Sequence, residues 1–311
     1  MSNTDAAARI AVLIPCLNEA STIAKVVSDF RRALPDATVY VGDNASTDDT
    51  ALMAAEAGAT VLGEPLRGKG NVVRRMFRTI DADVYVLVDG DDTYDASAAP
   101  LLVAPIATGQ ADMVTADRLS STYFSENKRP FHNCGNRLVR SMINFIFGAR
   151  LHDIMSGYRA LSRDFVKNFP VMTRGFELET EMTIHALDKG YAIAEIATPY
   201  RDRPAHSVSK LNTFGDGTRV ICTIFSLFRR YRPMAFFSTL ALLSFVAGMV
   251  LIVPVLVEYW HTGLVPRFPS LIVACTFVLL ALLLYICGLI LSTVSYNHRQ
   301  VFELFRLHTR P

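Results

Sequence analysis

The chain has few of the features that mark secreted, zinc-stabilised or nucleic-acid-binding proteins. Its five cysteines show no CxxC spacing and no pairing pattern, which indicates a reducing compartment and no structural zinc. With 31 basic and 29 acidic residues the net charge is only +2, so no overall field favours nucleic acid. Residues 1–9 are polar and small, without a basic region before an apolar core, and we expect no cleavable signal peptide.

Two common phosphate-binding motifs are also missing. No G-x-G-x-x-G follows the first predicted strand, so we expect no dinucleotide cofactor. Residues 63–70 have the spacing G-x-x-x-x-G-K, but Gly70 stands where a P-loop needs a Ser or Thr hydroxyl for Mg²⁺. We therefore reject an NTPase, although Arg67 and Lys69, just before a predicted helix, can still contact a phosphate.

Apolar residues are concentrated after Pro233. They make up 51% of the chain, and the mean hydropathy is +0.27. Residues 235–257 and 270–296 carry no charge, and because about 20 apolar residues span a bilayer, each predicts a transmembrane helix. The intervening loop 258–269 has a single arginine, whereas basic residues flank the pair on its outer sides: Arg229, Arg230, Arg232, Arg299, Arg306 and Arg310. The positive-inside tendency then predicts an inner-membrane protein with both termini and the catalytic domain in the cytoplasm.

Residues 214–232 link the two halves. Apolar residues recur there at helical spacing beside arginines, which favours an amphipathic helix in the membrane interface; a helix docked on the domain is the alternative. We therefore expect a cytoplasmic catalytic domain (1–213), this interfacial helix (214–232), a two-helix membrane anchor (233–298) and a cytoplasmic tail (299–311).

The first 213 residues alternate between strand and helix patterns. Apolar strands are expected at 10–15, 38–41, 60–62, 84–88, 112–115 and 192–197, and helices between them, the first capped by Ser21. Residues 133–147 predict an amphipathic helix. This alternation predicts an α/β fold with a doubly wound, mainly parallel sheet.

Acidic residues follow the strand at 84–88 directly. Asp89, Asp91 and Asp92 come within four positions, and carboxylates this close repel one another unless a cation or donors neutralise them. Oxygen ligands of this kind suit Mg²⁺ or Mn²⁺. Asp43 ends the strand at 38–41 in the same way, and ligands of open α/β sheets bind at the carboxyl ends of strands. An acidic turn in solvent is the simpler alternative, since turns favour Asp and Gly.

These segments together resemble glycosyltransferase family 2, and within it the polyprenyl-phosphate glycosyltransferases. The matching segments, which span most of residues 9–215, are 14–19 (IPCLNE), 43–48 (DNASTD), 67–70 (RGKG), 89–91 (DGD), 156–159 (SGYR) and 209–211 (SKL). The resemblance implies a GT-A-type fold that uses a nucleotide-sugar and a divalent metal, Mg²⁺ or Mn²⁺.

The resemblance also implies roles for particular residues. Asp91 would bind the metal, with Asp89 and Thr93 in the metal shell; many relatives carry Gln at the position of Thr93. The nucleotide pocket would be lined by Pro15, Asn18, Glu19, Asp43, Lys69 and Asp89. Basic residues would handle the lipid phosphate or the nucleotide diphosphate: Arg118, Arg159, Arg201, Arg203 and Lys210. Of these, Arg118 and Arg159 would act with Asp89 and Asp91 in catalysis.

The implied reaction is an inverting transfer of a sugar from a nucleotide-sugar to undecaprenyl phosphate or another polyprenyl phosphate. UDP-glucose and UDP-N-acetylglucosamine are favoured as donors, and GDP-mannose stays open. A phosphomonoester with a second pKa of about 6 is already a nucleophile at neutral pH, so no base is required; Asp153, Glu177 and Glu179 are the reserve candidates. The alternatives are a polysaccharide synthase, a nucleotidyltransferase and a non-enzymatic scaffold that binds nucleotide-sugar. Membrane-anchored relatives can form tetramers, so a homo-oligomer is possible.

Overall fold

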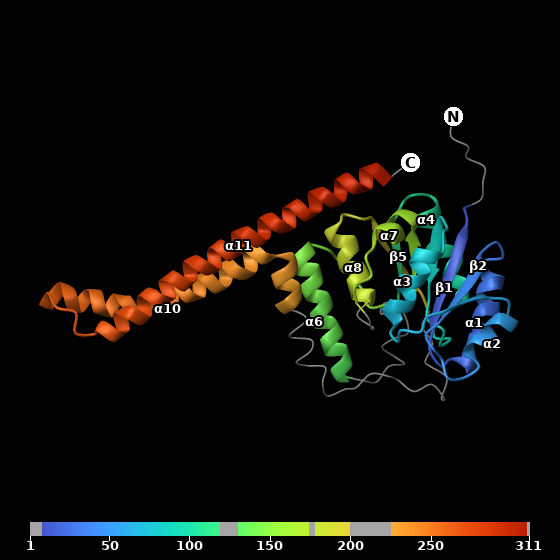
Figure 1. The fold of residues 1–311 in the computed structure, drawn as a ribbon, viewed down its shortest axis with the longest axis horizontal. Coiled ribbons are helices and arrows are strands. Elements are labelled where there is room, and N and C mark those ends of the chain that lie inside the picture. The colour runs from blue at the N-terminus through green and yellow to red at the C-terminus, as the bar shows by residue number, and fades with distance from the viewer. Residues whose placement is uncertain (1–7, 119–129, 174–177, 200–224, 310–311) are drawn as a thin grey trace. The chain divides into compact units, whose positions relative to one another are not determined.

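The structure is a computed structural model that describes residues 8–118, 130–173, 178–199 and 225–309. The chain divides into two compact units, Met1–Phe214 and Gly215–Pro311, each of which is described by itself (Figure 1). The first unit holds the sheet and every residue expected in the catalytic site.

Among the described residues, seven strands form one sheet in the order β3-β2-β1-β4-β6-β5-β7. All neighbours run parallel except β6, which is antiparallel to both β4 and β5. The fold is thus the expected mainly parallel α/β sheet, but β6 was not expected, because a four-residue run that begins with Arg159 carries little strand signal. The strands are β1 (Ile10–Cys16), β2 (Thr38–Asp43), β3 (Thr60–Gly63), β4 (Val84–Leu87), β5 (Met113–Asp117), β6 (Arg159–Ser162) and β7 (Ile193–Ala197).

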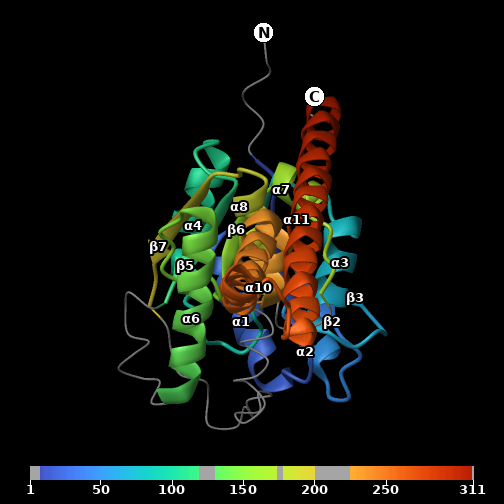
Figure 2. The ribbon, with the colours of Figure 1, turned by 90° about the vertical axis from the view of Figure 1, so that its left-hand side faces the viewer.

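Helices cover both faces of the sheet (Figures 1 and 2). The N-cap of the first helix is Glu19, so the expected cap at Ser21 is wrong; the backbone N–H of Ala20 instead donates to Asp48 Oδ2 at 3.2 Å, from the loop after β2. The helix expected at 133–147 begins earlier, at Pro130. The described helices of this unit are α1 (Ala20–Ala33), α2 (Thr50–Glu56), α3 (Lys69–Thr79), α4 (Ala99–Ala107, after the 3₁₀ turn Ala96–Ala98), α6 (Pro130–Phe147), α7 (Arg163–Asn168) and α8 (Leu178–Asp188).

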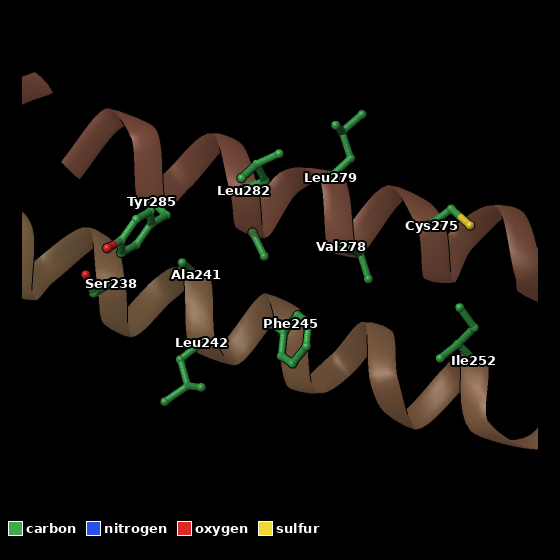
Figure 3. Close-up of a pocket in the computed structure, with 11 residues that line it drawn as sticks. Ser238, Ala241, Leu242, Phe245, Ile252, Cys275, Val278, Leu279, Leu282 and Tyr285 are labelled. Carbon is green, nitrogen blue, oxygen red and sulfur yellow. The ribbon is translucent and has the colours of Figure 1, made fainter. Parts of the chain in front are cut away.

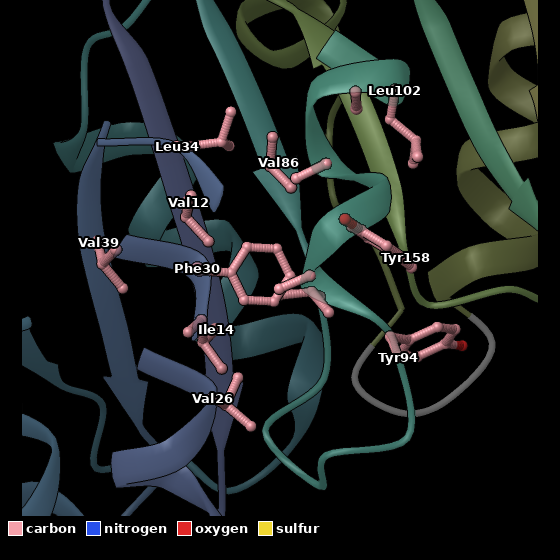
Figure 4. Packing of buried hydrophobic residues seen from close by; sticks show 14 of the residues in the cluster. Val12, Ile14, Val26, Phe30, Leu34, Val39, Val86, Tyr94, Leu102 and Tyr158 are labelled. Carbon is pink, nitrogen blue, oxygen red and sulfur yellow. The ribbon is translucent and has the colours of Figure 1, made fainter. Parts of the chain in front are cut away.

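The core lies between the sheet and the helices that pack on it (Figure 4). Val12 and Ile14 of β1 and Val86 of β4 are fully buried beneath Phe30 of α1. The ring of Phe30 meets the ring of Tyr158 edge to face, with centroids 5.8 Å apart. Each such side chain contributes about 1.5–3 kcal/mol on burial, which holds the central strands in fixed register.

The strand register brings one set of loops together. Cys16 pairs with Asp43 in the β1–β2 ladder, and Leu87 of β4 pairs with Arg159 at the start of β6. Because β5 and β7 run in the same direction as β4, the loops that follow β1, β2, β4, β5 and β7 and the loop that precedes β6 leave the sheet at one edge. This edge is where ligands of α/β sheets bind.

The second unit contains two long apolar helices, α10 (Pro233–Thr262) and α11 (Phe268–Thr309). Both are long and apolar enough to cross a membrane. Small residues let them approach closely: a Cβ on Gly248 would lie 3.2 Å from the carbonyl oxygen of Ala274. Ser244 donates its hydroxyl to Phe277 O at 2.8 Å, and an apolar pocket follows the seam (Figure 3).

The structure describes parts of two other segments expected near the C-terminus. Residues 299–309, expected as a tail, continue α11 without a break. Of the interfacial helix expected at 214–232, residues 214–224 lie outside the described residues, and residues 225–231 are helical.

Candidate active site

Three loops at the carboxyl edge of the sheet contain a non-glycine residue with left-handed backbone. These residues are Asn18 after β1, Ala45 after β2 and Asp92 after β4, with φ of 54°, 55° and 58°. Such a conformation costs an L-residue about 1–2 kcal/mol. Backbone strain of this kind concentrates at functional sites, where the surrounding structure enforces it. The backbone therefore singles out the loops that carry the expected site residues.

The loops after β1 and β2 are tied to each other. The N–H of Asn18 donates to Ser46 Oγ at 3.0 Å, and the N–H of Thr47 donates to Asn18 Oδ1 at 2.8 Å. Asn18, expected in the nucleotide pocket, thus holds the two loops together through both its backbone and its side chain. Pro15, expected there too, lies in β1 and pairs with Gly42.

Asp43 is the last residue of β2, and one of its carboxylate oxygens accepts no hydrogen bond from the described residues. Oδ2 accepts a long bond of 3.4 Å from the N–H of Ser46. Oδ1 is buried and has no hydrogen-bond partner within the described part of the chain. A buried acceptor without a donor is costly, so this oxygen suits a ligand that brings an N–H or O–H group.

Asn44, which the sequence did not single out, places the basic loop before α3. Its side-chain Nδ2 donates to Leu66 O at 2.8 Å, and its Oδ1 accepts from the N–H of Gly68 at 2.6 Å. These bonds fix the segment that carries Arg67 and opens α3 with Lys69. The general preference of Asn for backbone bonding in turns was a usable signal.

Lys69 lies between two carboxylates from distant parts of the chain. Its Nζ donates to Asp89 Oδ1 and, at 2.6 Å, to Glu179 Oε1 on α8. Burial by itself lowers the pKa of Lys69, but the charges of Asp89 and Glu179 outweigh it and raise the pKa well above the ordinary value. Lys69 is therefore a permanent cation. Glu179, a reserve base candidate, forms an ion pair with it.

Two glycines make room for the carboxylates at this edge. A Cβ on Gly157 would overlap the carboxylate of Asp89, and a Cβ on Gly90 would overlap that of Glu19. Glu19, expected in the nucleotide pocket, thus lies against the loop that follows β4. The absence of side chains at both positions brings Glu19 and Asp89 into the same region as Lys69.

The segment after β4 separates its acidic residues. Asp91 is 4% exposed, and its Oδ1 accepts the hydroxyl of Thr93 at 2.6 Å. Asp92 turns away to Lys25 on α1, with an N–O distance of 2.6 Å. Asp92 is therefore paired with a lysine instead of completing a metal shell, and Thr93 orients Asp91.

The carboxylates suit a hard divalent cation. No group of three or more His, Cys, Asp or Glu side chains gathers as a metal site within the described ranges. A cation would then be held by Asp91, with Asp89 and Thr93 nearby in sequence, and by oxygens of a bound diphosphate. Mg²⁺ is commonly bound in this way, by one or two carboxylates and substrate phosphates.

Arg118 follows β5 and pairs with Asp153. Its Nε donates to Asp153 Oδ2 at 2.7 Å, and its Nη2 donates to Oδ1 at 3.2 Å. Burial alone raises the pKa of Asp153, but the Arg118 charge and its hydrogen bonds lower it overall. Asp153, the second reserve base, is therefore a buried carboxylate that orients a half-buried arginine at the site edge.

Arg159 has a different role from the one expected. It is 0% exposed, and its nitrogens donate to Ser156 O at 2.9 Å, Ile154 O at 2.8 Å and Thr183 Oγ1 at 2.9 Å. Burial lowers its pKa to about 10, so it stays charged at neutral pH. A guanidinium enclosed in this way cannot contact a lipid phosphate; it holds the loop before β6.

Other unanticipated residues hold the same loop. Glu195 of β7 accepts the N–H groups of His152 and Asp153, both at 2.9 Å, and the hydroxyl of Tyr94 accepts the N–H of Gly157 at 3.0 Å. The loop of residues 151–158 thus carries Asp153 to Arg118 and Gly157 to Asp89. Four expected residues lie outside the described residues: Glu177, Arg201, Arg203 and Lys210.

Comparison with known proteins shows the family of this chain. The model of the family Glycosyl transferase family 2 matches residues 11–169. Glycosyltransferase AglJ of Haloferax volcanii is 30% identical over 292 residues, which is 94% of this chain and 95% of that protein. A dolichyl-phosphate hexose transferase of the same organism is 30% identical over 211 residues, 68% of this chain and 90% of its own length.

A solved structure is similar as well. Glucosyl-3-phosphoglycerate synthase from Mycobacterium tuberculosis, in complex with Mn²⁺, UDP-glucose and phosphoglyceric acid, is 27% identical and superposes with a TM-score of 0.55 over 70% of this chain and 79% of that one. The chain therefore belongs to glycosyl transferase family 2. It is a GT-A-fold glycosyltransferase that uses a nucleotide-sugar, and it carries two helices that are long and apolar enough to cross a membrane.

Proposed function

We propose that the chain transfers a hexose from a nucleotide-sugar to undecaprenyl phosphate or another polyprenyl phosphate, with inversion, at the cytoplasmic face of the inner membrane. The observation that carries this proposal is that a family 2 catalytic domain and two helices able to cross a membrane belong to one chain. The similarity to a dolichyl-phosphate hexose transferase supports a lipid phosphate as acceptor. Glucose or N-acetylglucosamine is the favoured sugar, with UDP as the nucleotide.

The donor would bind over the ends of β1, β2 and β4. Asp43 offers a buried carboxylate oxygen to a donor group of the nucleoside, and Lys69 provides a fixed positive charge. Asp91, oriented by Thr93, would hold Mg²⁺ or Mn²⁺, and the bound cation would supply positive charge to the departing diphosphate. Asp89, which accepts a hydrogen bond from Lys69, would bind the ribose or the sugar.

The acceptor would approach from the side of Arg118. An oxygen of the lipid phosphate forms the new bond to the anomeric carbon, and the nucleoside diphosphate leaves with the electrons of the old C–O bond. The acceptor phosphate is already ionised at neutral pH, so the step needs no proton acceptor. This agrees with the pairing of both described reserve bases, Glu179 with Lys69 and Asp153 with Arg118. Arg201, Arg203 and Lys210 would complete the cationic surface for the lipid phosphate.

The proposal is tested with the full chain in detergent, polyprenyl phosphate, Mn²⁺ or Mg²⁺, and labelled UDP-glucose, UDP-N-acetylglucosamine and GDP-mannose in parallel. Label that enters the organic phase from one donor, and is lost with Asp91→Asn but retained with Asp92→Asn, would establish the reaction and name the sugar. Label that stays aqueous with every donor would refute a lipid acceptor.

A soluble phosphate acceptor is the second candidate. The solved relative that holds UDP-glucose also holds phosphoglyceric acid, which bears a phosphate without a lipid. The same assay with phosphoglyceric acid in place of the lipid tests this candidate, because its glucosylated product would remain in water.

A further inference from the structure

Helix α6 has a wider apolar surface than its own domain covers. Val139, Ile143 and Ile146 point inward and are buried. Leu138 and Phe145 are also apolar, yet they are 50% and 78% exposed. Successive residues of an α-helix are about 100° apart, so Leu138, Met142 and Phe145 form one stripe beside the buried face. This lateral stripe (Leu138, Met142 and Phe145) needs an apolar environment that the described residues of the catalytic unit do not supply.

The charge of the same segment is of one sign. Residues 130–150 contain three arginines and neither Asp nor Glu. Arg137 and Arg150 are exposed, and Arg140 is half-buried. An apolar stripe flanked by arginines, without acidic residues, is complementary to an anionic lipid surface, where the apolar side chains enter the acyl boundary and the arginines meet phosphates.

We propose that α6 lies along the surface of an anionic bilayer, with the lateral stripe in the headgroup and acyl boundary and with Arg137 and Arg150 at lipid phosphates. A bilayer is favoured over a protein partner because the same chain carries two helices long and apolar enough to cross one, and helices that cross a bilayer would tether the catalytic unit to it. The inference goes beyond the proposed reaction and holds for any acceptor.

The polar side of α6 is bonded to the loop that carries Asp153. Asn144 donates to Leu151 O at 2.9 Å and accepts the Leu151 N–H at 3.1 Å, while Arg140 donates to His152 O at 2.9 Å. The next residue, Asp153, binds Arg118. Binding of α6 to lipid would therefore fix the helix to which the loop with Asp153 is bonded, and through Asp153 it would fix the position of Arg118.

The test places a fluorescent reporter on the stripe. The full chain with Trp260→Phe, which removes the only tryptophan, receives Phe145→Trp and is reconstituted in nanodiscs that contain phosphatidylglycerol with brominated acyl chains. Tryptophan emission should fall strongly relative to unbrominated nanodiscs. The matched control is Leu52→Trp, which should not be quenched, because Leu52 is 57% exposed and belongs to α2, a helix that lies apart from α6 in both views (Figures 1 and 2). Equal emission of Phe145→Trp in both kinds of nanodisc would overturn the proposal.

A second measurement distinguishes the bilayer from a second copy of the chain. Phe145→Glu should leave the molecular mass of the assembly in detergent unchanged. It should also reduce the ratio of the transfer rate in phosphatidylglycerol to the transfer rate in phosphatidylcholine. A drop in mass with Phe145→Glu would instead assign the stripe to an interface between copies and overturn the bilayer. Quenching requires no turnover, so it is informative even if the proposed reaction fails.

Discussion

Gly157 leaves the space that the carboxylate of Asp89 occupies. The two residues lie in different loops, since Asp89 follows β4 and Gly157 precedes β6, and a Cβ at position 157 would overlap Asp89 Oδ2. Asp89 is thereby held against Lys69, the buried cation at the start of α3. The position of Asp89 on the donor side of the site therefore requires that residue 157 has no side chain.

We therefore expect Gly157→Ala to displace Asp89 from Lys69. Overpacking at a fixed backbone costs about 1–3 kcal/mol, and transfer activity should fall because the carboxylate loses its position. Thermal unfolding and initial transfer rates measure the two effects. Gly63→Ala is the control, because nothing lies within 4 Å of its added Cβ. Normal activity of Gly157→Ala would show that the position of Asp89 is unimportant.

Removal of the Lys69 charge should destabilise the domain. Lys69→Met leaves Asp89 and Glu179 facing each other without a cation, and breaking such a buried pair costs about 3–5 kcal/mol. The exposed Lys25, which pairs with Asp29 and Asp92, gives a control: Lys25→Met should cost at most about 1 kcal/mol. Denaturant or thermal unfolding of the full chain in detergent would compare them.

The pH dependence of this effect has a definite sign. The folded-state pKa of Lys69 is raised above its ordinary value of 10.5, so its contribution is fully present below that value and is lost only as the pH rises through the folded-state pKa. The stability difference between wild type and Lys69→Met should be constant between about pH 8 and pH 9.5, above the range in which the unpaired Asp89 and Glu179 carboxylates of the variant can take up a proton. A difference that shrinks within this range would contradict a permanently charged Lys69.

Acid should act through Asp153. Its folded-state pKa lies below the ordinary value of 3.8, because Arg118 outweighs the effect of burial. The unfolded chain therefore binds the proton first, and the stabilisation present above 3.8 is lost as the pH falls through the folded-state pKa. Asp153→Asn should be less stable at neutral pH and should approach wild type in acid. An equal difference in unfolding free energy between wild type and Asp153→Asn at neutral and at acidic pH would refute this role.

Replacement of Arg159 by lysine should affect both the stability of the domain and the binding of the acceptor. An ammonium group cannot reproduce the planar fork that bonds Ser156 O, Ile154 O and Thr183 Oγ1, and each buried carbonyl left unbonded costs about 1–3 kcal/mol. Arg159→Lys should lower stability and also raise the KM for the acceptor, since the loop carries Asp153 to Arg118. Arg163→Lys, at an exposed ion pair with Asp81, is the control and should change neither quantity. An unchanged acceptor KM in a folded Arg159→Lys protein would limit Arg159 to stability.

Asp91 and Asp92 should differ sharply in metal dependence. Asp91→Asn removes a buried carboxylate from the proposed metal site and should lower transfer by at least about a hundredfold at saturating Mn²⁺. Asp92→Asn breaks only a partly exposed pair with Lys25 and should leave the Mn²⁺ titration of activity unchanged. Equal effects of the two substitutions would mean that the whole acidic turn, rather than Asp91, binds the metal.

The class of fold, the edge of the sheet at which the site forms and the two apolar helices could all be predicted from the sequence. These depend on local patterns: strand periodicity, acids directly after a strand, and uncharged runs longer than a bilayer is thick. The sequence did not reveal β6, whose short sequence becomes a strand only because β4 and β5 flank it on both sides.

Tertiary structure alone decided what individual side chains do. The resemblance assigned Arg159 to a phosphate, whereas the structure buries it completely. Lys69 finds Glu179, 110 residues further along the chain, and Asp92 finds Lys25 on α1. Residue type limits which partners a charge accepts, but the partner itself is chosen by which segments the sheet brings to one edge, because electrostatic and hydrogen-bond energies depend on distances that no sequence spacing fixes.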